Sequence, residues 1–262
     1  MERLKNKKFF LLDMDGTIYL DDDLFEGTLP FLEKVREKGG KYLFLTNNSS
    51  KSADDYVEKL ARLGVEATAE DFLTSTEATV VYIKENYPDK SFYCVGTKSF
   101  VKQIRESGIK TVDGSDEDCF GVILSNDNEL NFEKITNACI LLLRGAEYIA
   151  TNPDWVCPTS FGSVPDCGAF AEMLEHATGR TPYFIGKPRP EMLHLAMKKF
   201  GFSPEETLMI GDRVYTDIAS GVNAGVDTVF VLSGEGVVSD IEKYNIKPSY
   251  IMKDIGELCE KI

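Results

Sequence analysis

The stretch Phe9-Phe10-Leu11-Leu12-Asp13-Met14-Asp15-Gly16-Thr17 decides how the rest of the chain is interpreted. Four consecutive apolar residues are typical of a strand that is buried on both faces, and the acidic residues beyond them mark its end. Residues 1–8 are basic, but the apolar run after them is too short for an export signal. The sequence therefore predicts a buried strand at 9–12 with the carboxylates of Asp13 and Asp15 directly beyond it.

Further apolar runs alternate with helical patterns along the chain. The runs span residues 42–45, 183–185, 208–210 and 228–232, and the helical patterns span residues 28–38, 52–62, 190–200 and 214–224. This alternation is typical of an α/β fold with helices packed on a parallel sheet. We therefore expect a doubly wound, Rossmann-like parallel sheet as the main unit.

A second series of patterns lies in the middle of the chain. Strand-like runs occur at 92–95, 122–124 and 148–150, and a helical pattern at 131–145 separates the last two. We expect residues 81–180 to form an α/β unit that is inserted into the first, so that residues 1–80 and 181–262 together make the outer unit.

Polar residues follow each of four runs of the outer unit. The runs end at Asp13, at Thr46-Asn47, at Gly186-Lys187 and at Gly211-Asp212. In an open parallel sheet, ligands bind outside the carboxyl ends of the strands. The sequence therefore predicts that these side chains meet in one crevice.

The residue types in this crevice indicate phosphoryl transfer. Up to four carboxylates are expected there, those of Asp13, Asp15, Asp212 and Asp217. Two like charges about 4 Å apart repel by about 4 kcal/mol at an effective dielectric constant of 20, so the cluster needs a cation. Oxygen ligands favour Mg²⁺ over zinc.

A cradle for an anion is expected beside the carboxylates. Lys187 supplies a positive charge, Thr46 supplies a hydroxyl, and Asn47 and Asn48 supply backbone N–H groups. The segment 49–52 resembles a helix N-cap, which adds the positive end of a helix dipole. A carboxylate nucleophile, Mg²⁺, lysine and an anion cradle together point to an aspartyl-phosphate intermediate.

Composition limits the other functions. The chain has 262 residues, with 29 basic and 43 acidic side chains and a net charge of −14, which disfavours nucleic acid and anionic membranes as partners. There is no apolar run of about 20 residues that would span a bilayer. Six cysteines without a CxxC pair predict reduced thiols rather than a zinc site, and we expect a soluble, cytoplasmic protein.

Several segments have a simpler interpretation beside the functional one. Asp217 either binds the metal, orients Lys187 or caps the helix at 214–224. Residues 21–23 are expected to be a solvated hairpin tip, and residues 233–236 a turn after the last strand. The loop 151–168 either contacts substrate or is a structural loop with a core tryptophan; its candidate contacts are Asp154, Trp155, Phe161 and Asp166.

The chain resembles the haloacid dehalogenase-like phosphatase superfamily at four motifs. They are Asp13-Met14-Asp15-Gly16-Thr17, Thr46-Asn47-Asn48, Lys187-Pro188 and Gly211-Asp212-Arg213-Val214-Tyr215-Thr216-Asp217. Within the superfamily it is similar to the 4-nitrophenylphosphatase/NagD-type branch, whose members carry a large α/β cap of the C2 type. The resemblance implies that 1–80 and 181–262 form the catalytic core and that 81–180 form the cap.

The resemblance also implies a role for each residue. Asp13 attacks phosphorus, and Asp15 donates a proton to the leaving group and later activates water. Lys187, Thr46, Asn47 and Asn48 bind the phosphoryl oxygens. Mg²⁺ is held by Asp13, the backbone carbonyl of Asp15 and Asp212, with Asp217 bound directly or through water. The expected substrate is a small phosphorylated metabolite, and 4-nitrophenyl phosphate is the expected artificial one.

Alternative functions share parts of this pattern. A phosphomutase or phosphotransferase uses the same aspartyl nucleophile but returns the phosphoryl group to a substrate. Dehalogenases of the superfamily usually lack the second aspartate, so Asp15 argues against that reaction. A non-catalytic phospho-receiver module also gathers acidic residues with Thr and Lys, but catalytic turnover would distinguish the two. A binding module that has lost activity is disfavoured because every catalytic position is occupied. Related capped enzymes often dimerise, so the resemblance leaves a homodimer open, but no surface patch in the sequence indicates one.

Overall fold

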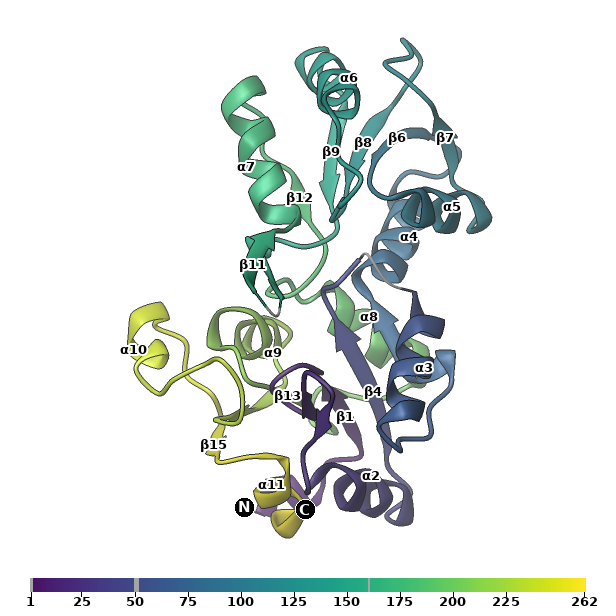
Figure 1. Ribbon diagram of the computed structural model, residues 1–262. Coiled ribbons are helices and arrows are strands. Elements are labelled where there is room, and N and C mark those ends of the chain that lie inside the picture. The colour runs from purple at the N-terminus through teal and green to yellow at the C-terminus, as the bar shows by residue number, and fades with distance from the viewer. Residues whose placement is uncertain (1, 50–51, 160) are drawn as a thin grey trace. The chain divides into compact units, whose positions relative to one another are not determined.

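The computed structural model describes residues 2–49, 52–159 and 161–262 (Figure 1). Their contacts divide the chain into two compact units. The first unit comprises Met1–Thr46, Ala53–Leu73 and Lys187–Ile262, and the second comprises Asn47–Ser52 and Thr74–Gly186. The chain leaves the first unit twice, first for the short segment Asn47–Ser52 and then for Thr74–Gly186, so the second unit is inserted into the first in two segments.

The first unit is built on a six-stranded sheet with the strand order β15-β14-β13-β1-β4-β5. Its strands are β1 (Phe9–Leu12), β4 (Lys41–Thr46), β5 (Phe72–Thr74), β13 (Thr207–Gly211), β14 (Asp227–Val231) and β15 (Tyr250–Met252). All four residues of β1 are buried, as its apolar run predicted. Strand β1 pairs in parallel with β13 on one side and β4 on the other, and Leu12 is aligned with Ile210 and Phe44. This register brings the ends of three strands to the same level.

Helices precede, connect or follow the strands of this sheet. They are α1 (Glu2–Lys5), α2 (Thr28–Glu37), α3 (Ala53–Arg62), α8 (Glu191–Phe200), α9 (Ala219–Asn223), α10 (Asp240–Tyr244) and α11 (Ile255–Lys261), with a 3₁₀ turn at Ala69–Asp71. The described part of the predicted cap segment 49–52 leads into α3, whereas Ser50 and Lys51 lie outside the described residues. Strands β2 (Tyr19–Leu20) and β3 (Asp23–Leu24) form the expected hairpin, with Asp21 at positive φ in its tip.

The helix predicted at 214–224 is divided into two parts. A π-helical turn spans Val214–Ile218, and α9 begins only at Ala219. The carboxylate of Asp217 accepts a hydrogen bond from the N–H of Arg213 at 3.0 Å, and the Ser220 hydroxyl donates to the carbonyl of Asp217 at 2.7 Å. Local side-chain bonds of this kind compete with a regular helix, and π turns are frequent at functional sites.

The second unit contains a five-stranded parallel sheet with the order β12-β9-β8-β6-β7. Its strands are β6 (Ser91–Val95), β7 (Lys110–Val112), β8 (Gly121–Leu124), β9 (Glu147–Ala150) and β12 (Tyr183–Phe184). Its helices are α4 (Ser75–Asn86), α5 (Lys98–Glu106), α6 (Phe132–Leu143) and α7 (Cys167–Thr178), and β10 (Val156–Thr159) pairs with β11 (Gly162–Pro165) in a separate hairpin.

The apolar run 183–185 was expected in the sheet of the outer unit, and this expectation is wrong. The run forms β12, which pairs with β9 at the edge of the second unit's sheet. Hydrogen bonds from Ile185 to Ala150 and from Gly186 to Thr151, at 3.0 and 2.8 Å, extend the pairing. A short apolar run identifies a buried strand but contains no information about which sheet it joins. Lys187 is therefore the first residue of the last segment of the first unit, and it does not follow one of that unit's strands.

Two further expectations concern the chain as a whole. None of the six cysteines, all of which the structure describes, forms a disulfide in it. Within the described residues, no helix combines the length and apolar character needed to cross a membrane.

Candidate active site

The carboxyl ends of three neighbouring strands carry the predicted site residues of the first unit. Asp13 follows β1, Thr46 ends β4, and Asp212 follows β13. The N–H of Asp13 donates to the carbonyl of Ile210 at 2.9 Å, so the β1–β13 pairing continues to the first site residue. The strand ends that the sequence predicted to converge do so at Asp13, Thr46 and Asp212.

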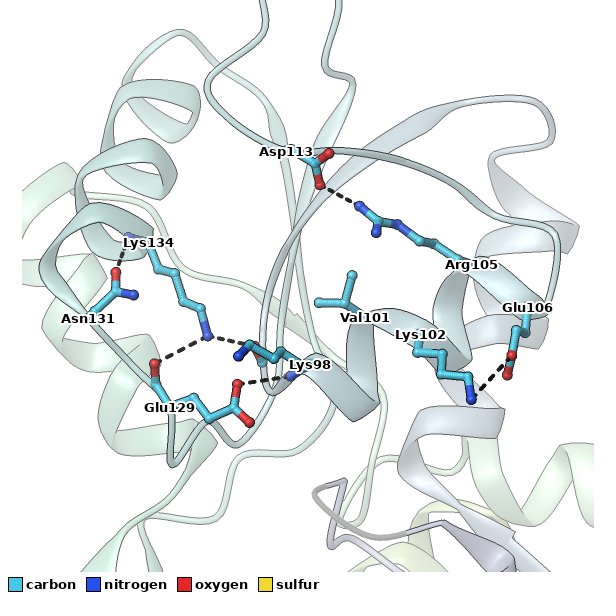
Figure 2. Close-up of a pocket in the computed structure, with 10 residues that line it drawn as sticks. Lys98, Val101, Lys102, Arg105, Glu106, Asp113, Glu129, Asn131 and Lys134 are labelled. Carbon is cyan, nitrogen blue, oxygen red and sulfur yellow. Dashed lines mark hydrogen bonds and ion pairs between the residues drawn. The ribbon is translucent and has the colours of Figure 1, made fainter.

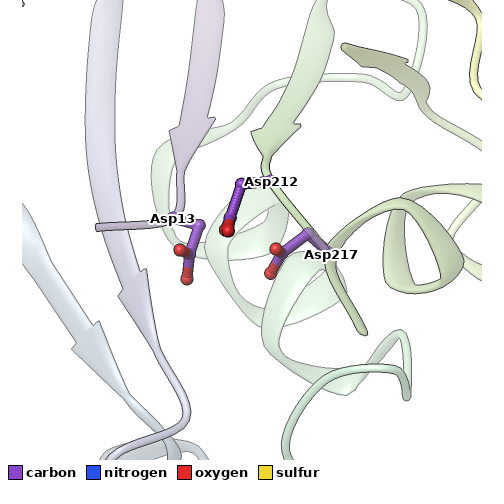
Figure 3. Close-up of side chains that lie close together, drawn as sticks. All are labelled: Asp13, Asp212 and Asp217. Atoms are coloured by element: carbon purple, nitrogen blue, oxygen red, sulfur yellow. The ribbon is translucent and has the colours of Figure 1, made fainter. Parts of the chain in front are cut away.

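Three carboxylates gather at this edge of the sheet. Asp13, Asp212 and Asp217 each place one oxygen within 4.8 Å of the other two, and Figure 3 shows the three side chains turned toward one another. Asp212 and Asp217 are each 1% exposed. The close approach of buried like charges is unfavourable, because burial removes the water that would screen them.

The same crowding raises two carboxyl pKa values. Burial is the largest cause for Asp13, and Asp217 and Asp212 add to it, so the pKa of Asp13 lies well above its ordinary value although Lys187 opposes the shift. Burial and the charge of Asp217 raise the pKa of Asp212 to about 7. The carboxylate cluster thus requires a compensating cation to remain ionised near neutral pH.

Lys187 is one such cation. Its Nζ lies 2.5 Å from Oδ1 of Asp13 and 2.8 Å from Oδ1 of Asp217, and it donates to the carbonyl of Leu45 at 3.3 Å. Its side chain is only 2% exposed. Burial alone would lower the pKa of Lys187, but the two carboxylates outweigh burial and raise the pKa above its ordinary value. Lys187 is therefore a fixed positive charge that holds one oxygen of each neighbouring carboxylate.

The remaining donors of the cluster fit a divalent cation. Three carboxylates and one ammonium have a formal charge of −2. Oδ1 of Asp212 is buried and has no hydrogen-bond partner among the residues that the structure describes, a costly arrangement unless something else contacts it. An all-oxygen set with this charge suits a hard ion such as Mg²⁺.

Asp15 lies apart from the three clustered carboxylates. Its side chain is 63% exposed, and its carboxylate is not one of the three in the cluster. The Tyr19 hydroxyl donates to Oδ2 of Asp15 at 3.3 Å, and Nζ of Lys59 lies 3.9 Å from Oδ1. This exposure suits a group that meets a substrate, and the predicted metal contact of this residue is its backbone carbonyl.

The predicted anion cradle is divided between the two units. Thr46 is buried in the first unit, with its hydroxyl 3.4 Å from the hydroxyl of Tyr56. Asn47 and Asn48 belong to the second unit, where the Ser75 hydroxyl donates to the carbonyl of Asn47 at 2.7 Å. The structure therefore brings together Asp13, Asp212, Asp217 and Lys187, and it leaves the roles of Asn47 and Asn48 as predictions.

A loop that the sequence suggested was an ordinary turn also belongs to the site. The N–H of Glu235 donates to Oδ2 of Asp212 at 2.8 Å, and the Ser233 hydroxyl donates to the carbonyl of Gly16 at 2.7 Å. A Cβ atom at Gly234 would lie 2.1 Å from Oδ2 of Asp212. The segment follows β14 and precedes β15. Its position after a strand of the same sheet was the sequence feature that could have predicted its place in the site.

The candidate substrate loop has two exposed aromatic residues, one directly before β10 and one directly before β11. Trp155 is 58% exposed and Phe161 is 81% exposed, so the alternative of a core tryptophan is wrong. Asp166 caps α7 by accepting a hydrogen bond from the N–H of Cys167.

The second unit also contains a cavity of about 580 Å³ (Figure 2). It lies between α5 and the loops that follow β6 and β8, and opposite charges are paired around it, for example Arg105 with Asp113. None of the residues predicted for phosphoryl transfer lines it. The lining residues are Gly96, Lys98, Val101, Lys102, Arg105, Glu106, Asp113, Glu129, Asn131 and Lys134.

Fold and site together define an α/β enzyme with an acidic centre at the carboxyl edge of a parallel sheet. A family model described as haloacid dehalogenase-like hydrolase matches residues 10–110, and a HAD-hydrolase-like model matches residues 184–258. An acid sugar phosphatase of Staphylococcus aureus is 35% identical over 99% of both chains. The chain belongs to the haloacid dehalogenase-like hydrolases.

Solved structures specify the branch. A 4-nitrophenylphosphatase from Thermotoga maritima matches with a TM-score of 0.92 and 40% identity over 98% of each chain. NagD from E. coli K-12 matches with a TM-score of 0.88 and 31% identity over 96% of this chain and 98% of that one. The protein is thus a hydrolase of the NagD-type branch, in the class of phosphoric monoester hydrolases.

Proposed function

We propose that this protein hydrolyses small phosphate monoesters, sugar phosphates among them, in a Mg²⁺-dependent reaction through an aspartyl-phosphate on Asp13. The observation that carries the proposal is the carboxylate of Asp13 at a buried strand end, held through one oxygen by Lys187 and faced by two further carboxylates. The name of the Staphylococcus aureus relative supports a sugar phosphate as substrate, and the name of the Thermotoga maritima structure supports 4-nitrophenyl phosphate.

The first step uses Asp13 as the nucleophile. Lys187 holds Oδ1, so Oδ2 is the oxygen available to attack phosphorus. The new bond joins Oδ2 to phosphorus, and the bond between phosphorus and the ester oxygen breaks. Asp15 donates a proton to the departing oxygen, which leaves as an alcohol. Its exposed side chain allows this contact.

The second step releases phosphate. Asp15, now a carboxylate, takes a proton from a water molecule that attacks phosphorus, and the bond between phosphorus and Asp13 breaks. Inorganic phosphate leaves, and both aspartates return to their initial states. Lys187, Thr46, Asn47 and Asn48 are proposed to bind phosphoryl oxygens, so that negative charge is stabilised as it develops.

The metal would be held by Asp13, the backbone carbonyl of Asp15 and Asp212, with Asp217 acting directly, through water or through Lys187. When bound, Mg²⁺ supplies positive charge that keeps the carboxylates ionised and stabilises the phosphoryl oxygens. We also propose that residues 81–180 act as a cap that excludes water during the reaction.

The test measures phosphate release from 4-nitrophenyl phosphate and from a panel of sugar phosphates, with Mg²⁺ and with chelator. We expect turnover that chelator abolishes and that Asp13→Asn abolishes, because an amide cannot form the covalent intermediate. The matched control is Asp21→Asn, the same change at an exposed hairpin tip. Near-normal turnover by Asp13→Asn would contradict the covalent mechanism, and transfer of phosphate to a second substrate instead of water would indicate a mutase.

A further inference from the structure

Tyr19 contacts the proposed general acid Asp15 through its side chain, and its backbone pairs with the residue after Asp15. Its carbonyl accepts a hydrogen bond from the N–H of Gly16 at 2.8 Å, which closes the turn after Asp15. Its hydroxyl donates to Oδ2 of Asp15 at 3.3 Å. Tyr19 is fully buried, whereas the Asp15 side chain is 63% exposed. A fixed phenol therefore touches one oxygen of a side chain that otherwise faces outward.

Lys59 of α3 completes the arrangement. Its Nζ lies 3.8 Å from the centre of the Tyr19 ring and 3.9 Å from Oδ1 of Asp15. An ammonium at this distance over an aromatic face is attracted by the ring. Tyr19 and Lys59 thus approach different oxygens of one carboxylate, and both contacts favour the observed orientation of that carboxylate.

Packing alone does not explain why residue 19 carries a hydroxyl group. The ring of Tyr19 belongs to the hydrophobic core of the first unit, where phenylalanine would fill almost the same volume. A buried hydroxyl requires a hydrogen-bond partner, and here a partner is a carboxylate that the proposed reaction uses. The hydroxyl therefore has an effect on Asp15 that phenylalanine could not reproduce.

We propose that Tyr19 is a positioning residue that orients the carboxyl group of Asp15 for proton transfer to the leaving alcohol. Oδ2 is held by the phenol at hydrogen-bond distance, whereas Oδ1 lies 3.9 Å from the Lys59 ammonium, beyond hydrogen-bond distance. Oδ1 is therefore the oxygen that exchanges the proton. This inference rests on the proposed function. The inference goes beyond the proposed function because it assigns a role to a core residue that touches no reacting atom.

The orientation of an acid matters most when the leaving group needs a proton. An alkoxide is a poor leaving group and departs with a proton from the acid, whereas 4-nitrophenolate is stable as an anion and departs with little help. A misplaced acid should therefore slow hydrolysis of an alkyl phosphate and affect the nitrophenyl ester only slightly.

The experiment compares kcat/KM for glycerol 3-phosphate, or another alkyl phosphate that the wild type hydrolyses, with kcat/KM for 4-nitrophenyl phosphate. For Tyr19→Phe we expect a loss of about tenfold on the alkyl ester and less than about twofold on the nitrophenyl ester. The control is Tyr42→Phe, which removes a phenol that contacts Arg36 in the same unit and should change neither value. Equal loss on both esters, or no loss on either, would overturn the proposal.

A double-mutant cycle tests whether Tyr19 acts through Asp15. In an Asp15→Asn background the acid is absent, so Tyr19→Phe should have no further effect on the alkyl ester. A loss that persists in that background would overturn the proposal, because it would show a general structural effect. If the wild type hydrolyses neither ester, the proposed function fails and this inference fails with it; wild-type turnover with an unchanged Tyr19→Phe variant rejects this inference alone.

Discussion

At the residue scale, the electrostatics of the site depend on Lys187. The ammonium lies between two carboxylates with almost no exposure to water, so each charge is stabilised by a partner rather than by solvent. Removing one partner from a buried ion pair leaves an uncompensated charge, which costs far more than the pair itself contributes. The same ammonium is proposed to stabilise the phosphoryl oxygens, so the residue serves both stability and catalysis.

Lys187→Met should therefore lose activity and stability together. We expect kcat to fall by about 100-fold or more and the free energy of unfolding to fall by about 3 kcal/mol. Steady-state kinetics and urea unfolding measure the two effects. Lys102→Met, at a lysine whose side chain is 74% exposed, should change the unfolding free energy by less than about 0.5 kcal/mol. A fully active Lys187→Met variant would remove this lysine from the mechanism.

Gly234 provides a second residue-scale prediction, because no side chain fits where it approaches Asp212. The Cβ of Gly234→Ala would overlap Oδ2 of Asp212, and the Asp212 carboxylate must then move. We expect the affinity for Mg²⁺ to fall by about tenfold or more. Thermal unfolding at increasing Mg²⁺ concentration measures this affinity. The control is Gly114→Ala, because a Cβ atom at Gly114 would meet no described atom within 4 Å. An unchanged Mg²⁺ affinity would show that Asp212 does not hold the ion.

At the element scale, the segment after β4, residues Asn47–Ser52 of the second unit, is joined to the rest of that unit by hydroxyl groups. The hydroxyl of Ser49 lies 2.8 Å from the hydroxyl of Ser125 and 3.0 Å from that of Thr151, and it accepts from the N–H of Asn126 at 3.2 Å. Ser49 itself is fully buried. Ser125 directly follows β8 and Thr151 directly follows β9, so one serine connects the segment to both strand ends.

Ser49→Ala should destabilise the protein by about 2 kcal/mol, because buried donors lose their acceptor. Urea unfolding measures the change. Ser239→Ala is the control, since the Ser239 side chain makes no capping hydrogen bond at α10. A change below about 0.5 kcal/mol in Ser49→Ala would mean that the neighbouring hydroxyls find other partners.

At the scale of the whole molecule, two buried thiols report on the integrity of the second unit. Cys94 lies in β6 and Cys167 at the first turn of α7, and burial raises the pKa of each to about 12. The reactive thiolate is therefore scarce at neutral and mildly alkaline pH. The thiolate fraction of these two cysteines becomes large only when the pH approaches their pKa of about 12.

We expect iodoacetamide to leave Cys94 and Cys167 unmodified in the folded protein between about pH 7 and pH 9. Both should react once urea unfolds the chain. Peptide mass spectrometry identifies the modified residues, and the half-buried Cys259 is the internal comparison. Modification of Cys94 or Cys167 as fast as Cys259 would show that the second unit opens without global unfolding.

The elements of the fold could be predicted from the sequence to different extents. Strand β1 matches its predicted bounds because a continuous apolar run followed by aspartate identifies both the buried strand and its end. The run 183–185 formed a strand in the other sheet, because pairing depends on contacts distant in sequence. The π turn at Val214–Ile218 was missed for a related reason, since the regular apolar pattern does not reveal side-chain bonds to the backbone.

The site residues show the same division. The sequence by itself determined the class of chemistry, because acidic residues, threonine and lysine beyond buried runs restrict the choice to phosphoryl transfer. The family comparisons agree with that class. Only the tertiary structure decided which carboxylates meet. Asp13, Asp212 and Asp217 form one cluster, in which Lys187 is paired with Asp13 and Asp217. The exposed carboxylate of Asp15 instead contacts Tyr19. Local sequence determines where a strand ends, but the distance between two strand ends depends on sheet order and register, which arise from packing of the whole unit.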